Sequence, residues 1–259
     1  MVKFVGSIAH YLTRRELLWM KNLANEKNIG DKVYVPRSKI GLDQDGFSSF
    51  YCTTVVDRGP SKIKVDLPNG ATSDWISVSF ARKHIKALVV ALGDYKSELL
   101  LIDPLYKTTL HHLRLLLAED EAIGIKVRSL AELTKFWKEE QSEISHVVFI
   151  GHGRSDAIYF GVDEWITATE LGNSLRVRGA PKKHFLFLCC KTGQQKFSKP
   201  FSKTAICEDI AAPFHSVHGA IASQFAQTYF LSMYLGGRTS KVAFNHAKDA
   251  IVDSTSFRF

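Results

Sequence analysis

Two apolar stretches of the sequence end in residues with reactive side chains: residues 146–153 read HVVFIGHG, and residues 184–193 read HFLFLCCKTG. Each begins with a near-continuous apolar run, which is typical of a strand covered on both faces of a parallel sheet. The first run leads into Gly151-His152-Gly153, and the second leads into Cys189-Cys190. An imidazole and a thiol therefore follow two successive predicted strands.

The surrounding segments alternate between strand and helix patterns from Lys86 onward. Further strands are predicted at residues 86–92 and 123–127, with a fifth at 204–207. Helices are predicted at 110–117, from the capping box at Ser129 to Gln141, after the capping box at Thr167, at 220–235 and at 240–252. This alternation predicts a three-layer α/β fold with a mostly parallel sheet. Reactive groups collect at the carboxyl ends of the strands in such sheets, so the thiol and the imidazole are expected to face each other.

The first third of the chain has a different pattern. A capping box at Thr13 predicts a short amphipathic helix through Leu23, and short strand patterns separated by turn residues follow at 31–36, 49–57, 61–67 and 75–80. Short strands without helices between them favour a small β-rich domain of the SH3-like barrel type. We therefore expect two domains: residues 1–85, with the helix and the barrel, and residues 86–259, with the parallel sheet.

His152 and Cys190 form a chemically competent pair. A neutral imidazole accepts the thiol proton, and the thiolate is the nucleophile at neutral pH. The glycines on both sides of His152 leave room for a substrate backbone. The backbone amides of Gly153 and Cys190 are the expected donors of an oxyanion hole.

At these two motifs the sequence resembles the caspase-like clan of cysteine peptidases, in particular the CHAT branch, which is related to separase. In that branch one apolar strand ends in His-Gly and a later one ends in a small residue followed by Cys-x-Thr-Gly, which Cys190-Lys191-Thr192-Gly193 matches. The resemblance covers about residues 86–259 and assigns the base to His152 and the nucleophile to Cys190. The segment GVDEWITATEL at 161–171 is similar to the family's tryptophan-containing turn and the helix after it.

The resemblance implies a cysteine endopeptidase that cleaves a protein partner. It also implies a regulated effector in a bacterial defence or cell-death system, with a sensor or regulatory protein as a second partner. The sequence departs from the family's pattern at Cys189, where the family has alanine, so an exchange of roles between Cys189 and Cys190 stays open. Strand alternation predicts that only one of the two faces the cleft.

Several other residues compete for roles in the site. Asp156 is a candidate selector of a basic substrate side chain, or a turn residue. Residues 193–200 are either an activation or specificity loop, or an ordinary surface connection. The alternative bases are the remaining histidines near the motifs: His111, His112, His215 and His218.

Composition limits the class of protein. The chain of 259 residues is 45% hydrophobic and 23% charged, which is typical of a globular protein, and no apolar run has the length of a membrane helix. We expect a cytoplasmic protein that does not contact a membrane. Its four irregularly spaced cysteines predict free thiols, and neither zinc-ligand spacing nor a cofactor motif accompanies them.

Two other classes of function stay open. The net charge is +8, and residues 1–85 carry 13 Lys and Arg against 8 Asp and Glu, so nucleic acid is a possible partner of the first domain. The second alternative is a catalytically inactive caspase-like scaffold whose N-terminal domain acts as an adaptor.

Overall fold

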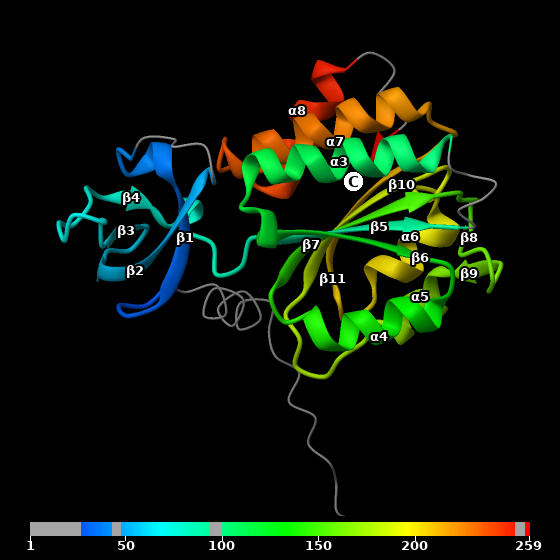
Figure 1. Cartoon of the computed structure of the whole chain (residues 1–259), viewed down its shortest axis with the longest axis horizontal. Helices are drawn as coiled ribbons and strands as arrows, with labels where there is room; N and C mark the ends of the chain where they lie inside the picture. Colours follow the sequence, from blue (N-terminus) through cyan, green and yellow to red (C-terminus); the bar gives the residue numbers. More distant parts are fainter. Residues whose placement is uncertain (1–26, 43–47, 94–99, 252–256) are drawn as a thin grey trace, which may run out of the picture.

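The computed structural model describes residues 27–42, 48–93, 100–251 and 257–259. The helix expected at Thr13–Leu23 lies outside these residues. In the described part of the chain, a small antiparallel sheet precedes a larger α/β unit (Figure 1). No helix among the described residues is long and apolar enough to cross a membrane.

The larger sheet has six strands in the described part of the chain, in the order β12-β11-β10-β7-β5-β6. Its strands are β5 (Lys86–Leu92), β6 (Ala122–Val127), β7 (Ile144–Gly151), β10 (Lys183–Cys189), β11 (Cys207–Pro213) and β12 (Phe257–Arg258). All adjacent pairs are parallel except β11 with β12. The chain goes from β5 outward to β6 and then returns past β5 to β7. The sheet therefore has a topological switch point between β5 and β7.

Among the described residues, helices cover both faces of this sheet (Figure 1). One face carries α3 (Ile102–Leu116), α7 (Gly219–Tyr234) and α8 (Ser240–Ala250); the other carries α4 (Leu130–Glu140), α5 (Ala168–Ser174) and α6 (Gln195–Ser202). Two separate apolar clusters fill the two layers, one on each face. The hairpin of β8 (Ala157–Tyr159) and β9 (Trp165–Thr167) lies between β7 and α5 in the chain. The three-layer, mostly parallel architecture expected from the sequence is confirmed.

The capping residues explain where two of these helices begin. The Thr167 side chain accepts a hydrogen bond from the Glu170 amide, and the Glu170 carboxylate accepts one from the Thr167 amide. This reciprocal pair is a capping box, as expected. Ser129 caps α4 by accepting from the Glu132 amide, while the Glu132 carboxylate accepts from the amide of Arg128.

The small sheet consists of β1 (Lys32–Pro36), β2 (Phe50–Arg58), β3 (Lys62–Val65) and β4 (Ile76–Ser77), all antiparallel. After β4 the chain returns to β1, where Tyr34 and Arg82 exchange two backbone hydrogen bonds of 2.8 and 2.9 Å. The sheet therefore curls back on itself around a compact apolar core.

The small sheet packs against the α3/α7 side of the larger unit. Phe50 belongs to the core of that layer, where its ring meets the Tyr234 ring edge-on at 5.7 Å. The Arg82 guanidinium donates to the carbonyl of Met233 (2.8 Å), and the Tyr34 hydroxyl donates to the Glu121 carboxylate (3.0 Å). These contacts, together with the hydrogen bond from the Ser49 amide to the carbonyl of Leu116 (3.1 Å), join the two parts of the chain.

Two expectations about the segments beyond the thiol motif are wrong. The fifth strand is β11 at Cys207–Pro213, and residues 204–206 form a turn before it. The segment 193–200 is not a loop, because all of it from Gln195 onward belongs to α6. Phe197 and Phe201, spaced one helical turn apart, are fully buried against the sheet. The sequence did not predict this helix, because Pro200 and the polar residues around it are typical of a loop.

Helix α6 is expected to depend on Phe197, whose ring meets the rings of Phe187 and Phe201 at 5.1 and 6.0 Å. Phe197→Ala should lower the free energy of unfolding by about 3–5 kcal/mol, because it leaves a cavity in a closed core. Urea denaturation followed by circular dichroism measures this. Leu115→Ala on the exposed side of α3 is the control and should change stability by less than about 0.5 kcal/mol. Equal effects of the two substitutions would contradict the burial of α6.

Candidate active site

His152 comes directly after β7, on the α3/α7 side of the sheet. Successive side chains of a strand point to opposite faces. Val148 and Ile150 belong to the α3/α7 layer, and Val147 and Phe149 belong to the other. The same alternation directs His152 to the α3/α7 face.

Cys190 follows β10 on the same face. Leu186 and Leu188 lie in the α3/α7 layer, whereas Phe187 and Cys189 lie in the opposite one. Alternation therefore directs Cys190 toward α3 and α7.

The pairing of β7 with β10 brings the two residues together. The strands are parallel, and their last paired residues are Cys189 and Gly151. Cys190 and His152 are the next residues along each strand, and adjacent strands lie about 4.8 Å apart. Both residues line one small hollow together with residues of α3 and α7. The thiol and imidazole expected at one edge of the sheet thus share one cavity.

The four cysteines differ in access, and all are free thiols. Cys189 is fully buried and its Sγ donates to the carbonyl of Phe149 at 3.6 Å. Burial raises the pKa of the Cys189 thiol far above its usual range, and the neighbouring Cys190 adds to the effect. Burial likewise raises the pKa of Cys207 to about 12. Cys189 is therefore a protonated core residue, which argues against an exchange of roles with Cys190.

A tight turn holds Cys190 at the end of β10. The buried Thr192 hydroxyl donates to the carbonyl of Cys189 at 2.7 Å. The Lys191 amide donates to the carbonyl of His215 (3.2 Å), and Lys191 has a φ of +63°, which few residues other than glycine adopt. Backbone conformations of this kind persist only where the surroundings enforce them.

Gly193 is required by the same turn. Its amide donates to the carbonyl of Pro213 at 2.8 Å, and a Cβ added to it would lie 2.6 Å from the carbonyl oxygen of Ala212. Only a residue without a side chain allows the turn to approach β11 this closely. The Thr-Gly part of the motif therefore fixes the position of the thiol through backbone contacts.

Gly153 lies against the backbone of the thiol turn. A Cβ on Gly153 would be 2.6 Å from the carbonyl oxygen of Cys190 and 2.9 Å from Cys189 Cβ. Gly153 also forms a bridge with Ile158, whose flanking hydrogen bonds come from the amides of Tyr159 and Arg154. In an antiparallel ladder this arrangement turns the amide of the central residue away from its partner strand. The Gly153 amide is therefore not used in the pairing of Gly153 with Ile158.

None of the four alternative histidines lines the hollow that contains Cys190. His111 is exposed on α3, and the ring of His112 lies 3.1 Å from the carbonyl oxygen of Gln227. Burial lowers the pKa of His112. His218 caps α7 by accepting from the Ala220 amide, and His215 is exposed, its carbonyl accepting from the thiol turn.

Asp156 lies in the loop between Gly153 and β8. Its carboxylate accepts from the Arg154 guanidinium at 2.8 Å, and Arg154 lies over the ring of Trp165 at 4.6 Å. Asp156 therefore has a cationic partner from its own loop, which weakens the expectation that it selects a basic substrate side chain.

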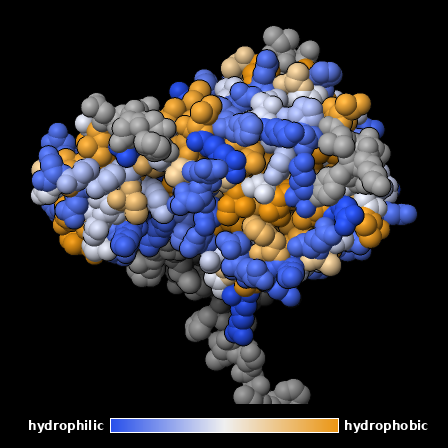
Figure 2. Space-filling model, in the orientation of Figure 1, coloured by the Kyte–Doolittle hydropathy of each residue, from blue (hydrophilic) through white to orange (hydrophobic). Residues whose placement is uncertain are grey.

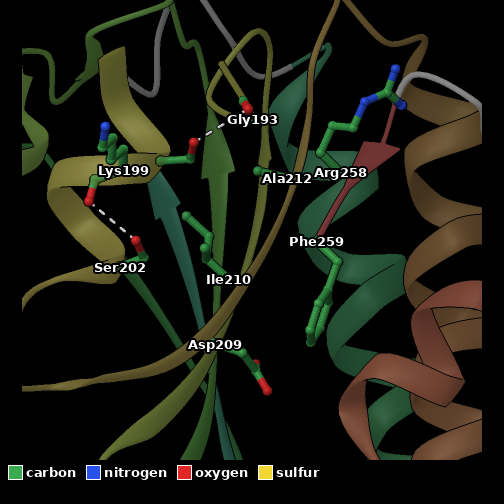
Figure 3. Close-up of a pocket in the computed structure, with 9 residues that line it drawn as sticks. Gly193, Lys199, Ser202, Asp209, Ile210, Ala212, Arg258 and Phe259 are labelled. Atoms are coloured by element: carbon green, nitrogen blue, oxygen red, sulfur yellow. Dashed lines mark hydrogen bonds between the residues drawn. The ribbon is translucent and has the colours of Figure 1, made fainter. Parts of the chain in front are cut away.

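A separate cavity of about 350 Å³ lies behind the thiol turn, at the edge of the sheet (Figure 3). Gly193 and Lys199 lie on one side of it, Arg258 and Phe259 on the other, and Ile210 of β11 lies between them. Neither Cys190 nor His152 lines this cavity. It is therefore distinct from the candidate active site.

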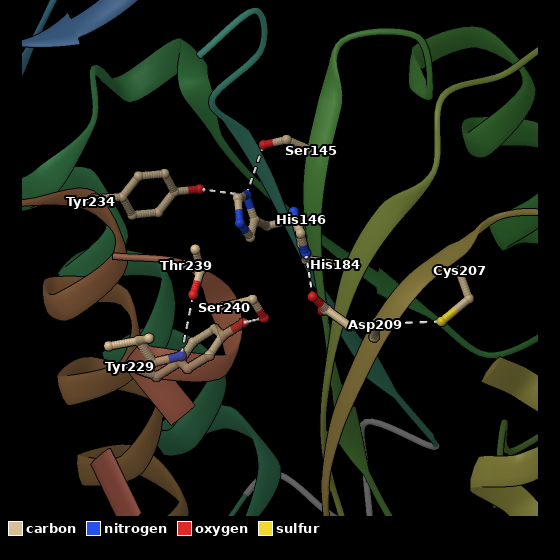
Figure 4. Close-up of polar contacts among 10 residues, drawn as sticks. Ser145, His146, His184, Cys207, Asp209, Tyr229, Tyr234, Thr239 and Ser240 are labelled. Carbon is tan, nitrogen blue, oxygen red and sulfur yellow. Dashed lines mark hydrogen bonds and ion pairs between the residues drawn. The ribbon is translucent and has the colours of Figure 1, made fainter. Parts of the chain in front are cut away.

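The sequence analysis missed a partly buried polar cluster at the amino ends of β7 and β10 (Figure 4). The rings of His146 and His184 stack at 4.8 Å, and His184 Nδ1 pairs with the Asp209 carboxylate at 2.8 Å. His146 Nδ1 lies 2.9 Å from the Tyr234 hydroxyl and 2.7 Å from that of Ser145. His146 and His184 are six residues before the site along their strands, or about 20 Å. The only sign of this cluster in the sequence was that the apolar run before His152 also begins with a histidine, His146.

A comparison of the sequence with models of known protein families and with curated proteins finds no match. The assignment of the site therefore depends on the geometry of its residues.

Stability should fall in mild acid because of His146. Its ring is fully buried, and burial, with His184 and Arg82 nearby, lowers its pKa well below the usual 6.5. Below about pH 6.5 the unfolded chain binds a proton at this position that the folded chain does not bind. The free energy of unfolding should then decrease by up to about 1.4 kcal/mol per pH unit from this group.

His146→Gln is the test, because it removes the titrating group and keeps polar atoms in the cluster. Urea denaturation at about pH 7.5 and about pH 5.5 should give a smaller loss of stability in the variant than in the wild type. The histidines that do not contact His146 are common to both proteins and cancel in the comparison, whereas His184 loses its stacking partner in the variant. If the free energy of unfolding decreased equally in both proteins, His146 would not be the group that causes the loss of stability in acid.

Proposed function

We propose that the chain is a cysteine endopeptidase of the caspase-like type, with Cys190 as nucleophile and His152 as general base. The single observation that supports this most directly is the register of β7 and β10, which makes the two residues neighbours on one face of the sheet. The shared hollow and the fixed turn at Lys191 add to it. The strand order places the site next to the switch point of the sheet. Parallel sheets bind their ligands at such positions.

The proposed reaction begins with transfer of the Cys190 proton to the His152 imidazole. The thiolate forms a bond to the peptide carbonyl carbon, and the electron pair of the C=O bond moves to oxygen. The amides of Gly153 and Cys190 hold this oxyanion. The C–N bond then breaks as the imidazolium gives its proton to the leaving amine.

The resulting thioester is hydrolysed in a second step. His152 removes a proton from water, the hydroxide adds to the thioester carbonyl, and the C–S bond breaks. The proton returns to sulfur, which restores the enzyme and releases a carboxylic acid. The role of a regulated effector in bacterial defence or cell death follows from the resemblance, and a cytoplasmic location was expected from the composition; both stay proposals.

The test of this proposal needs no knowledge of the substrate. Cys190 and the exposed Cys52 are compared in one protein as they react with iodoacetamide at about pH 6, with mass spectrometry following each thiol. Since an imidazole accepts the thiol proton, Cys190 should react at least about tenfold faster than Cys52. His152→Ala should remove this advantage and leave the Cys52 rate unchanged.

Two controls accompany the measurement. His215→Ala removes an exposed histidine near the site and should leave the Cys190 rate unchanged. Cys189 should stay unmodified in the folded protein because it is buried. A Cys190 rate equal to that of Cys52, with no effect of His152→Ala, would favour the alternative of an inactive caspase-like scaffold.

A second candidate function is nucleic-acid binding by the small sheet, which we infer to be an SH3-like barrel. The observation that favours it is the partly exposed Trp75 ring, with the Lys64 ammonium 4.9 Å from its centre. An exposed aromatic ring beside cations is typical of single-stranded nucleic-acid sites, where bases stack on the ring. Arg58 and Lys62 on the neighbouring strands add positive charge.

Trp75→Ala should weaken binding of a single-stranded oligonucleotide to the full chain by about tenfold. Fluorescence anisotropy at low and high salt measures both the affinity and its salt dependence. Phe259→Ala is the matched control, because Phe259 has the same exposed fraction, 44%, and lies in the other unit. No salt-dependent binding by the wild type at low salt would exclude this function.

A further inference from the structure

The hollow beside Cys190 and His152 is small, with a volume of about 50 Å³. Its walls come from the starts of α3 and α7, and its floor comes from β7 and β10. The described apolar residues that line it are Leu101, Ile102, Leu105, Ile150, Leu188, Val217 and Ala222. Among the described residues that line it, only His152 and Cys190 have titratable side chains.

The hollow is too small for a long or aromatic side chain. A single water needs at least about 10–15 Å³ of such space, so 50 Å³ holds a group of only a few heavy atoms. Ligand sites that hold drug-sized molecules have about 300–1,000 Å³. A methyl, hydroxymethyl or isopropyl group therefore fits without displacement of the walls, whereas a long or aromatic side chain would extend beyond them.

The hollow also discriminates against charge. A carboxylate, ammonium or guanidinium inside it would lose its water, and among the described wall residues only the reacting Cys190 and His152 could carry a charge. Because the walls are leucine, isoleucine, valine and alanine, they offer no side-chain hydrogen bond in compensation. Small neutral side chains lose little on entry.

The position of the hollow determines which substrate residue enters it. Cys190 attacks the carbonyl carbon of the residue before the cleaved bond, and the side chain of that residue is attached one carbon away. A hollow that touches both the nucleophile and the base is within reach of this side chain and of few others.

We propose that the hollow binds the side chain of the residue that carries the cleaved carbonyl, and that it selects small, uncharged residues such as alanine, serine and valine. The inference depends on the proposed function of the same site. It assigns specificity to Val217 and Leu105 on the walls. It also excludes aspartate, arginine and phenylalanine at that substrate position.

The test uses peptidyl acyloxymethyl ketones that differ only in the residue next to the reactive group: alanine, leucine, aspartate, arginine or phenylalanine. The alkylation rate of Cys190 in the full chain is followed by mass spectrometry, with iodoacetamide as a reference that needs no side-chain site. The alanine probe should react at least about tenfold faster than the aspartate, arginine and phenylalanine probes, relative to iodoacetamide.

One variant enlarges the hollow. Val217→Ala removes two methyl groups from its wall and should raise the rate of the leucine probe relative to the alanine probe by about tenfold. Val242→Ala, on an exposed part of α8, is the matched control and should change neither rate.

The outcomes separate this inference from the proposed function. Fast, His152-dependent alkylation by iodoacetamide with equal rates for all five probes, or a preference for a charged or aromatic probe, would overturn the inference alone. If Cys190 of the wild type did not react with iodoacetamide in a His152-dependent way, both the inference and the proposed function would be overturned. The predicted order of probes, together with the shift in Val217→Ala, supports the inference.

Discussion

The parallel register of β7 and β10 is the constraint on which the rest of the site depends. It pairs Cys189 with Gly151 and makes Cys190 and His152 the next neighbours on one face. A shift of one residue in either strand would turn one of the two side chains to the opposite layer. The buried side chains of both layers oppose this shift, because Leu188 and Phe187 would exchange surroundings. The hydrophobic core thus sets the position of the reactive pair.

Backbone contacts complete what the register begins. Gly153 lies against Cys190, and Gly193 lies against β11, both at distances that exclude a Cβ. The Thr192 hydroxyl fixes the carbonyl before Cys190, and Lys191 takes a left-handed conformation. The turn is therefore held in one conformation, which in the proposed reaction would limit the entropy lost when the reacting atoms meet.

The small sheet contacts the larger unit at the amino ends of the larger sheet's strands, which is the end away from Cys190 and His152 (Figure 1). Arg82 reaches the carbonyl of Met233 and lies over the Tyr234 ring at 5.6 Å. The Tyr234 hydroxyl contacts both the carbonyl of Ile85 and the His146 ring. This continuous set of polar contacts runs from the small sheet to the amino ends of β5 and β7.

The face of the molecule shown in Figure 2 carries hydrophobic surface between α3 and α4, where β6 is the edge strand of the larger sheet.

The sequence alone determined the strand–helix alternation, the two capped helices and the two residues of the pair, because apolar periodicity and capping are local properties. It did not reveal α6, whose burial of Phe197 and Phe201 depends on a sheet built from distant segments. Only the tertiary structure decided that Cys189 faces the core and Cys190 faces the hollow. It also decided that residues from α3 and α7 enclose that hollow. These outcomes depend on packing between segments far apart in the chain, and no local pattern encodes the space that such packing leaves.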